Sequence, residues 1–265
     1  MADLFEIVES GTPTTIGKIG NSEMVALHCA LAKQNLNQGD LHNIFTVAGV
    51  FPPTDIGLND FLVEFSSSLS QVDVLAKWRD EREDILISTY CPGASLVALR
   101  ELEPFYWDNP WSKALEEKKV LVISPFTDTI ISQYDKRLYL WKDSTVLPTM
   151  ELSTIKCPVS HYLRKSSYES WLEALEDMKK QMSIQDFDVC LIGAGAWSLP
   201  LAAHAKSLGK IGIHLGGGLQ ILFGIKGKRW DEHDVISHFY NDSWVRPSVT
   251  ETPENVSVVE GGCYW

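Results

Sequence analysis

Short apolar runs alternate with longer amphipathic segments along most of the chain. Lys119–Ser124 (KVLVIS) and Val189–Ile192 (VCLI) are almost entirely apolar, which is typical of strands buried on both faces of a parallel sheet. Short runs of this kind, bounded by glycine, proline or polar residues, predict strands. The predicted strands are Thr15–Gly20, Asn43–Val47, Asp84–Ser88, Lys119–Ser124, Ser144–Pro148, Val189–Ile192 and Lys210–His214.

Apolar residues three or four positions apart predict helices between these strands. One helix is expected to begin at Asn21, and others to cover Leu58–Lys77, Trp111–Lys118 and Tyr168–Met182. Strands that alternate with helices predict an α/β fold with a Rossmann-like, open and mostly parallel sheet of six or seven strands, covered by helices on both faces. Because no repeat or clear linker interrupts the pattern, residues 1–265 are expected to form a single domain.

The composition is that of an ordinary globular protein, with 45% hydrophobic and 22% charged residues. The formal net charge of −12 argues against binding to a nucleic acid polymer, which needs a surplus of Lys and Arg. Five widely spaced cysteines form no C-x-x-C pair, as expected in a reducing compartment. No secretory leader and no apolar run long enough for a membrane span is visible, so a cytoplasmic protein without a membrane span is expected.

Two glycine clusters follow consecutive predicted strands near the C-terminal end of the sequence. Gly193 and Gly195 follow Val189–Ile192, and a run of three glycines follows Lys210–His214. Glycines at the junction of a strand and a helix let a ligand approach the backbone and leave N–H groups for phosphate. We therefore expect a site for a ligand with hydroxyls and phosphates, bound by Gly193, Gly195, Ser198, His214, Gly216, Gly217, Gly218, Gln220, Lys226, Arg229 and Trp230.

The first cluster, GAGAWS, differs from the dinucleotide-binding pattern G-x-G-x-x-G. Ser198 occupies the third glycine position, and the next strand ends in Ile213 and His214 where that fold has an acidic residue. An NAD(P)-dependent oxidoreductase is therefore the less favoured alternative. A plain turn would explain a lone G-x-G, but the second glycine cluster and the basic segment that follows it favour a ligand site.

Polar residues follow four of the predicted strands: Gly20–Glu23, Ser124–Thr129, Gly193–Ser198 and His214–Gln220. In a parallel sheet these segments meet at the edge where ligands bind. The carboxylates there, Glu23 and Asp128, are candidates for the general base of a group transfer. Taken singly, each is also explained as a helix-capping residue.

The segment KIGNSE resembles the R-x-G-D-G-E segment of the GT-D type glycosyltransferases. Two later blocks are similar to proteins of the same group, NPWSKALEEKKVLVISPFTDTI and LIGAGAWSLPLAAHAKSLGKIGIHLGGGLQILFGIKGKRW, and so is the terminal YW. The resemblance extends from about Gly17 to Trp265. It implies a Rossmann-like fold, a nucleotide-sugar donor, and a D-x-E motif that binds a divalent cation, commonly Mn²⁺.

In this sequence the D-x-E motif falls on Asn21, Ser22 and Glu23, so only the second acid is kept. The resemblance implies that Glu23 and Asn21 hold Mn²⁺ or Mg²⁺ and that Gly20 and Asn21 contact the donor. With a neutral Asn21 the cation site is weakened, and Lys226 or Arg229 is expected to act on the diphosphate in its place.

The sequence therefore predicts a glycosyltransferase of polysaccharide biosynthesis. It would move a sugar from a nucleoside-diphosphate sugar of the UDP or GDP type to a hydroxyl of a glycan acceptor. The main alternative is a protein that binds a nucleotide sugar without catalysis.

Overall fold

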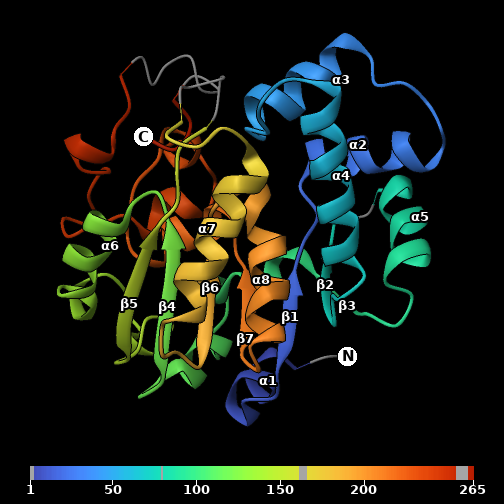
Figure 1. Cartoon of the computed structure of the whole chain (residues 1–265). Helices are drawn as coiled ribbons and strands as arrows, with labels where there is room; N and C mark the ends of the chain where they lie inside the picture. The colour runs from blue at the N-terminus through green and yellow to red at the C-terminus, as the bar shows by residue number, and fades with distance from the viewer. Residues whose placement is uncertain (1–2, 79, 161–165, 255–261) are drawn as a thin grey trace.

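Seven strands form one parallel sheet in the order β3-β2-β1-β7-β6-β4-β5 (Figure 1). The arrangement is that of a computed structural model, which describes residues 3–78, 80–160, 166–254 and 262–265. Because every pairing is parallel, the carboxyl ends of all seven strands lie at one edge, the upper one in Figure 1. The predicted open α/β sheet is confirmed. Its strands are β1 (Thr14–Gly17), β2 (Val74–Lys77), β3 (Ser95–Ala98), β4 (Lys119–Ser124), β5 (Glu151–Lys156), β6 (Val189–Ile192) and β7 (Ile211–His214).

Helices α2, α4, α5, α7 and α8 cover one face of the sheet, and α7 and α8 lie in front of it in Figure 1. Their contact with the sheet is apolar, and Trp171 packs at its centre. The Trp171 ring stacks on Trp197 at a centroid distance of 6.2 Å and meets the edge of Phe61 at 5.2 Å. These helices and the short α3 are α2 (Asn21–Leu31), α3 (Gln38–His42), α4 (Asp55–Leu69), α5 (Glu81–Tyr90), α7 (Trp171–Ser183) and α8 (Ser198–Ser207).

The opposite face is covered by α1 (Leu4–Ser10), α6 (Thr127–Tyr134), α9 (Gly217–Leu222) and many short turns. No helix in the described ranges is both long and apolar enough to cross a membrane. The 3₁₀ turns are Leu99–Leu102, Pro104–Tyr106, Trp111–Leu115, Arg137–Tyr139, Ser144–Val146, Gly195–Trp197, Lys228–Trp230, Ile236–Phe239 and Val249–Glu251.

The neighbouring strands β4, β6 and β7 do not all send their following helices to the same face of the sheet. The chain leaves β4 for α6 and β7 for α9 on one face, whereas it leaves β6 for α8 on the other. The loops after β4, β6 and β7 therefore diverge and leave a crevice outside the carboxyl ends of the strands. Ligands of open α/β sheets bind at such a switch in topology.

Two predicted strands are helical in the structure. Asn43–Val47 is a π-helical turn that continues α3, which begins with a capping box between Asn37 and Asp40. Asp84–Ser88 lies inside α5, where the Asp80 side chain accepts the backbone N–H of Arg82. Both predictions were wrong because a short apolar run does not distinguish a helix from a strand. In both segments a capping residue upstream starts a helix.

Two further predictions had wrong boundaries or positions. The helix predicted over Leu58–Lys77 ends at Leu69, and Val74–Lys77 is the strand β2. Ser144–Pro148 is not a strand, because Asp143 accepts the backbone N–H of Thr145 and starts a 3₁₀ turn, so the strand begins only at Glu151. The edge strand β3 was not predicted, since three of its four residues are exposed.

Close packing of β7 against α8 depends on Gly212. A Cβ atom at this position would lie 2.3 Å from the carbonyl oxygen of Ala202, a backbone atom that cannot turn aside. Gly93, by contrast, has open space around the same position.

We expect Gly212→Ala to lower the free energy of unfolding by about 1–3 kcal/mol, the usual cost of overpacking. Gly93→Ala, the matched control, should change it by less than about 0.5 kcal/mol. Urea unfolding of the two variants measures both values. Equal stability of the two would contradict the close approach of α8 to β7.

Candidate functional site

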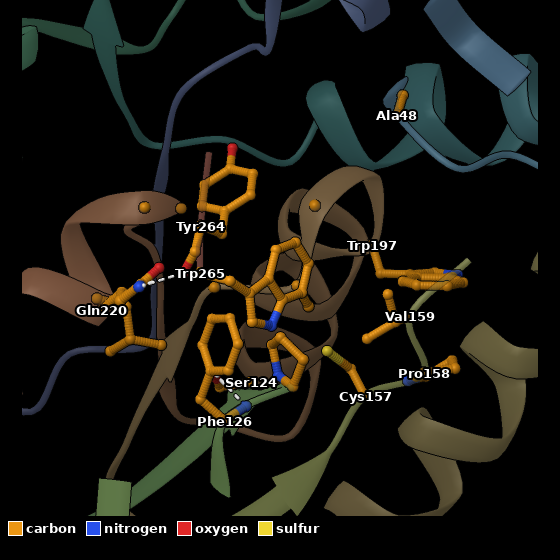
Figure 2. Close-up of a pocket in the computed structure, with 17 residues that line it drawn as sticks. Ala48, Ser124, Phe126, Cys157, Pro158, Val159, Trp197, Gln220, Tyr264 and Trp265 are labelled. Atoms are coloured by element: carbon orange, nitrogen blue, oxygen red, sulfur yellow. Dashed lines mark hydrogen bonds between the residues drawn. The ribbon is translucent and has the colours of Figure 1, made fainter. Parts of the chain in front are cut away.

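The crevice at the carboxyl edge of the sheet contains a pocket (Figure 2). Its lining is mostly apolar side chains and glycine backbone, as is usual for small-molecule sites. The loops after β4, β5, β6 and β7 all contribute to the wall, together with the last two residues of the chain. The lining includes Ser124, Phe126, Cys157, Val159, Gly193, Gly195, Trp197, Gly216, Gly217, Gln220, Tyr264 and Trp265.

Glycines bring the loops after β6 and β7 into contact. A Cβ atom on Gly193 would lie 2.8 Å from the carbonyl oxygen of Gly216. Gly216 itself has a φ of +59° and Gly195 a φ of +56°, backbone conformations that only glycine adopts readily. The floor of the pocket at this point is therefore bare backbone.

The two glycines after Gly216 make room for other side chains of the protein. A Cβ atom on Gly217 would meet the Trp230 ring at 2.9 Å, and one on Gly218 would meet the Glu103 side chain at 3.3 Å. Trp230 is buried and packs against the Tyr264 ring at 6.0 Å. The structure thus places Trp230 behind Gly217, in the core, and not as an exposed ring on the pocket.

A cluster of charged residues lies next to Gly216, around Lys18 at the end of β1. The Lys18 ammonium nitrogen is 3.4 Å from the position of a Cβ atom on Gly216 and 5.8 Å from the centre of the Trp78 ring. Burial lowers the pKa of Lys18, and the charge of Arg229 also lowers it. The charges of Glu103 and Glu23 raise it. We call Lys18, Glu23, Glu103 and Arg229 the charged cluster.

Sequence reasoning missed Lys18 and Glu103. A signal for Lys18 was present, since it stands directly after the first strand at the position of the arginine in R-x-G-D-G-E. Glu103 carried no signal, because it comes from a loop of 3₁₀ turns far from the glycine clusters in the sequence.

Glu23 occupies the third position of α2, and its carboxylate folds back over the start of that helix. A Cβ atom on Gly20 would lie 2.2 Å from Glu23 Oε2, so Gly20 provides the space that this conformation needs. Burial raises the pKa of Glu23, while its own backbone N–H and the nearby Lys18 lower it. The Glu23 carboxylate therefore caps the start of α2 and also belongs to the charged cluster.

The cation site predicted at Asn21 and Glu23 stays a prediction. Asn21 is exposed at the first position of α2, whereas Glu23 is buried at the third, so the two side chains differ in their surroundings. Mg²⁺ and Mn²⁺ are usually held by several oxygen ligands, carboxylates above all. Within the described ranges, no three His, Cys, Asp or Glu residues are grouped so as to hold a metal ion.

His214 connects the end of β7 to the residue that follows β1. Its Nδ1 donates a hydrogen bond to the carbonyl oxygen of Lys18 at 3.1 Å, because a carbonyl oxygen can only accept. Burial and the charge of Lys18 lower the pKa of His214 to about 3. The ring is therefore neutral near pH 7, and its Nε2 carries a lone pair on the side of Gly216.

The C-terminal residues 262–265, here called the terminal strap, form one wall of the pocket. Gln220 Nε2 donates to the carbonyl oxygen of Tyr264 at 2.7 Å and to that of Lys226 at 3.1 Å. The Arg229 guanidinium lies over the Tyr264 ring at 4.9 Å and donates to its hydroxyl. Gln220 and Arg229 thus position the strap beside the glycine loops.

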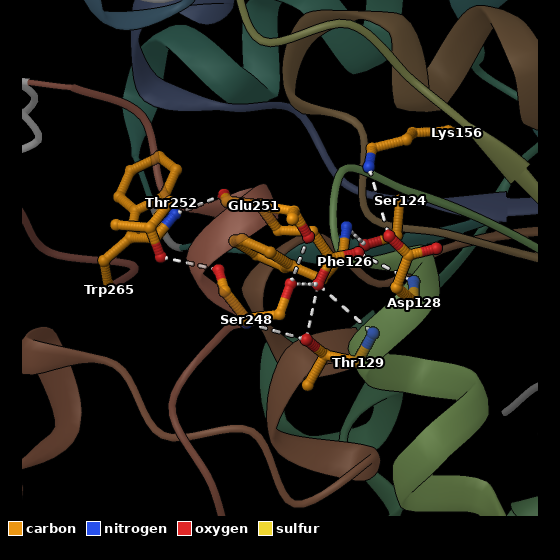
Figure 3. Close-up of polar contacts among 10 residues, drawn as sticks. Ser124, Phe126, Asp128, Thr129, Lys156, Ser248, Glu251, Thr252 and Trp265 are labelled. Atoms are coloured by element: carbon orange, nitrogen blue, oxygen red, sulfur yellow. Dashed lines mark hydrogen bonds and ion pairs between the residues drawn. The ribbon is translucent and has the colours of Figure 1, made fainter.

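Asp128 does not line the pocket. It is exposed at the start of α6 and forms a 3.6 Å ion pair with Lys156 (Figure 3). The N-terminus of α6 is already capped by the carboxylate of Glu251, which accepts the backbone N–H groups of Asp128 at 2.7 Å and Thr129 at 3.1 Å, and also the Thr129 hydroxyl. This helix terminus is satisfied by a carboxylate of the same chain.

The structure therefore separates the predicted site residues into groups. Gly193, Gly195, Gly216, Gly217 and Gln220 line the pocket. Glu23, His214 and Arg229 lie near Lys18, and Gly20 makes room for the Glu23 side chain. Ser198 is buried, and its hydroxyl accepts the backbone N–H of Ala194 at 2.9 Å within the turn after β6. Lys226 lies over the Tyr240 ring at 5.3 Å.

No family model matches this chain, and neither a curated protein nor a solved structure does. The resemblance to GT-D type glycosyltransferases stays a prediction, and the function has to be argued from the site itself.

We expect His214 to make folding stability dependent on pH. The folded protein binds the His214 proton with a pKa of about 3, while an unfolded chain binds it near 6.5. The unfolded state therefore takes up more protons below about pH 6.5, and this contribution lowers stability as the pH falls from there toward 3.

His214→Asn tests this expectation, because its amide keeps a donor for Lys18 but does not titrate. Urea unfolding between about pH 6 and pH 4 should show a shallower loss of stability in the variant than in the original chain. Identical pH dependence would mean that His214 takes up its proton in the folded protein as readily as in the unfolded chain.

Proposed function

We propose that this protein is a glycosyltransferase that uses a nucleoside-diphosphate sugar. The observation that carries the proposal is the junction of an aromatic pocket with the charged cluster. Gly216 belongs to both, since it lines the pocket and lies beside the Lys18 ammonium. A ligand with an apolar, hydrogen-bonding end and an anionic end fits that junction.

The diphosphate of the donor would lie at Gly216, next to Lys18 and Arg229. Bare backbone lets phosphate oxygens approach closely, and the two cations offset their charge. Cations at this place also stabilise the nucleoside diphosphate that leaves when the sugar is transferred.

The nucleoside would occupy the pocket beside Phe126 and Trp265, whose rings meet edge to face at 5.8 Å (Figure 2). Gln220 supports this assignment. Its Oε1 is buried and has no hydrogen-bond partner among the described residues, and buried acceptors of this kind normally have one. An N–H of a base or a ribose hydroxyl would supply it.

Glu23 is the carboxyl group best suited to accept the proton of the acceptor hydroxyl. Burial raises its pKa, and a base is most effective when its pKa is near the working pH. The glycan hydroxyl would lose its proton to Glu23 as it attacks the sugar, and the diphosphate would leave toward Lys18.

The second candidate is a protein that binds a nucleotide sugar without catalysis. The observation that favours it is the conformation of Glu23, which folds over Gly20 at the start of its own helix. In this case the carboxyl group acts only as a helix cap.

A thermal-shift panel of UDP-, GDP-, dTDP- and CMP-sugars tests the ligand class. NAD⁺ and NADP⁺ are included as the alternative ligands. At about 100 times Kd, a ligand of the folded state adds about 2.7 kcal/mol of stability, which corresponds to roughly 5–10 °C in a chain of this size. We expect at least one sugar nucleotide to give this shift and its free nucleoside to give less. Stabilisation by NAD⁺ or NADP⁺ alone would refute the proposal.

Glu23→Gln separates catalysis from binding alone. With the sugar nucleotide that the panel identifies, we expect sugar transfer or donor hydrolysis to slow by at least ~100-fold. Calorimetry should show that donor binding survives. Glu116→Gln, an exposed control, should behave like the original chain. Unchanged turnover in Glu23→Gln would leave Glu23 as a cap.

A further inference from the structure

We infer that Lys18 supplies the positive charge that this site places on a ligand diphosphate, so that diphosphate binding does not require a divalent cation. The inference rests on the proposed function and specifies how that site recognises its ligand. It differs from what the resemblance implies, which is a cation held by Glu23 and Asn21.

The backbone that follows the Lys18 side chain is held in place. The His214 ring donates to the carbonyl oxygen of Lys18 at 3.1 Å, and the Trp78 indole donates to the carbonyl oxygen of Ile19 at 2.9 Å. The Trp78 ring also lies near the ammonium group, at 5.8 Å. Because the backbone is fixed and the side chain is half-buried, Lys18 loses little freedom when it binds an anion.

The Lys18 ammonium group forms no ion pair with the residues that the structure describes. Across the ranges that the structure describes, no carboxylate oxygen lies within 4.0 Å of its nitrogen. Glu23 and Glu103 act on it only over longer distances. Its three hydrogen-bond donors remain for a ligand, and Gly216 beside it presents only backbone.

A divalent cation would fit poorly at the same place. The Glu23 carboxylate is turned onto Gly20, and Asn21 is exposed and neutral. Lys18 is the charged side chain that acts on Glu23, so a metal ion there would face an ammonium of the same sign. Lys18 thus supplies the positive charge that the cation supplies in a D-x-E site.

Titration calorimetry of the full chain with inorganic pyrophosphate and with UDP tests the inference. We expect binding in excess EDTA to be no more than about twofold weaker than in excess Mn²⁺. Lys18→Met should weaken both ligands by roughly tenfold to a hundredfold, the effect of losing one charged hydrogen bond, while the weaker binding of uridine stays the same. Lys18→Arg should keep most of the affinity in EDTA.

Lys136→Met, an exposed control with the same change of charge, should bind both ligands normally. Urea unfolding shows whether Lys18→Met is folded, and the comparison of EDTA with Mn²⁺ needs no variant at all. Binding that appears only with Mn²⁺ would overturn the role of Lys18 and leave the proposed function standing. A failure of every sugar nucleotide and of UDP to bind under either condition would overturn the proposed function as well.

Discussion

The contact between the loops after β6 and β7 is the constraint on which the candidate site depends. Gly193 lies so close to the carbonyl oxygen of Gly216 that a methyl group could not fit between them. This contact gives the crevice a floor of backbone, and it places Gly216 where Lys18 and His214 also meet. Any side chain at either glycine would separate the pocket from the charged cluster.

Two cations lie at the candidate site of a chain whose net charge is negative. The chain carries a net charge of −12, yet Lys18 and Arg229 lie together at the carboxyl edge of the sheet. Lys18 is half-buried and Arg229 is exposed. Because two nearby cations repel, the arrangement costs stability unless carboxylates or a ligand offset it. Glu23 and Glu103 do so in part, and an anionic ligand would complete it.

The strands buried on both faces could be predicted from the sequence, because KVLVIS and VCLI are almost entirely apolar. The glycine loops that follow were also placed correctly at the carboxyl edge of the sheet. Asn43–Val47 and Asp84–Ser88 could not be recognised as helical from their apolar residues alone, since capping groups at Asn37 and Asp80 decide their conformation. Contacts between distant segments were equally hidden, such as Trp230 behind Gly217 and Glu103 beside Gly218.

The central claim is that a nucleoside diphosphate binds where the pocket meets Lys18. A crystal structure of the protein soaked with UDP in the presence of EDTA tests it most directly. The account predicts the diphosphate against Gly216, within hydrogen-bond distance of Lys18 Nζ, and the base between the aromatic walls of the pocket. UDP bound elsewhere would contradict the account, for example in the groove lined by Phe105, Trp141 and Phe239.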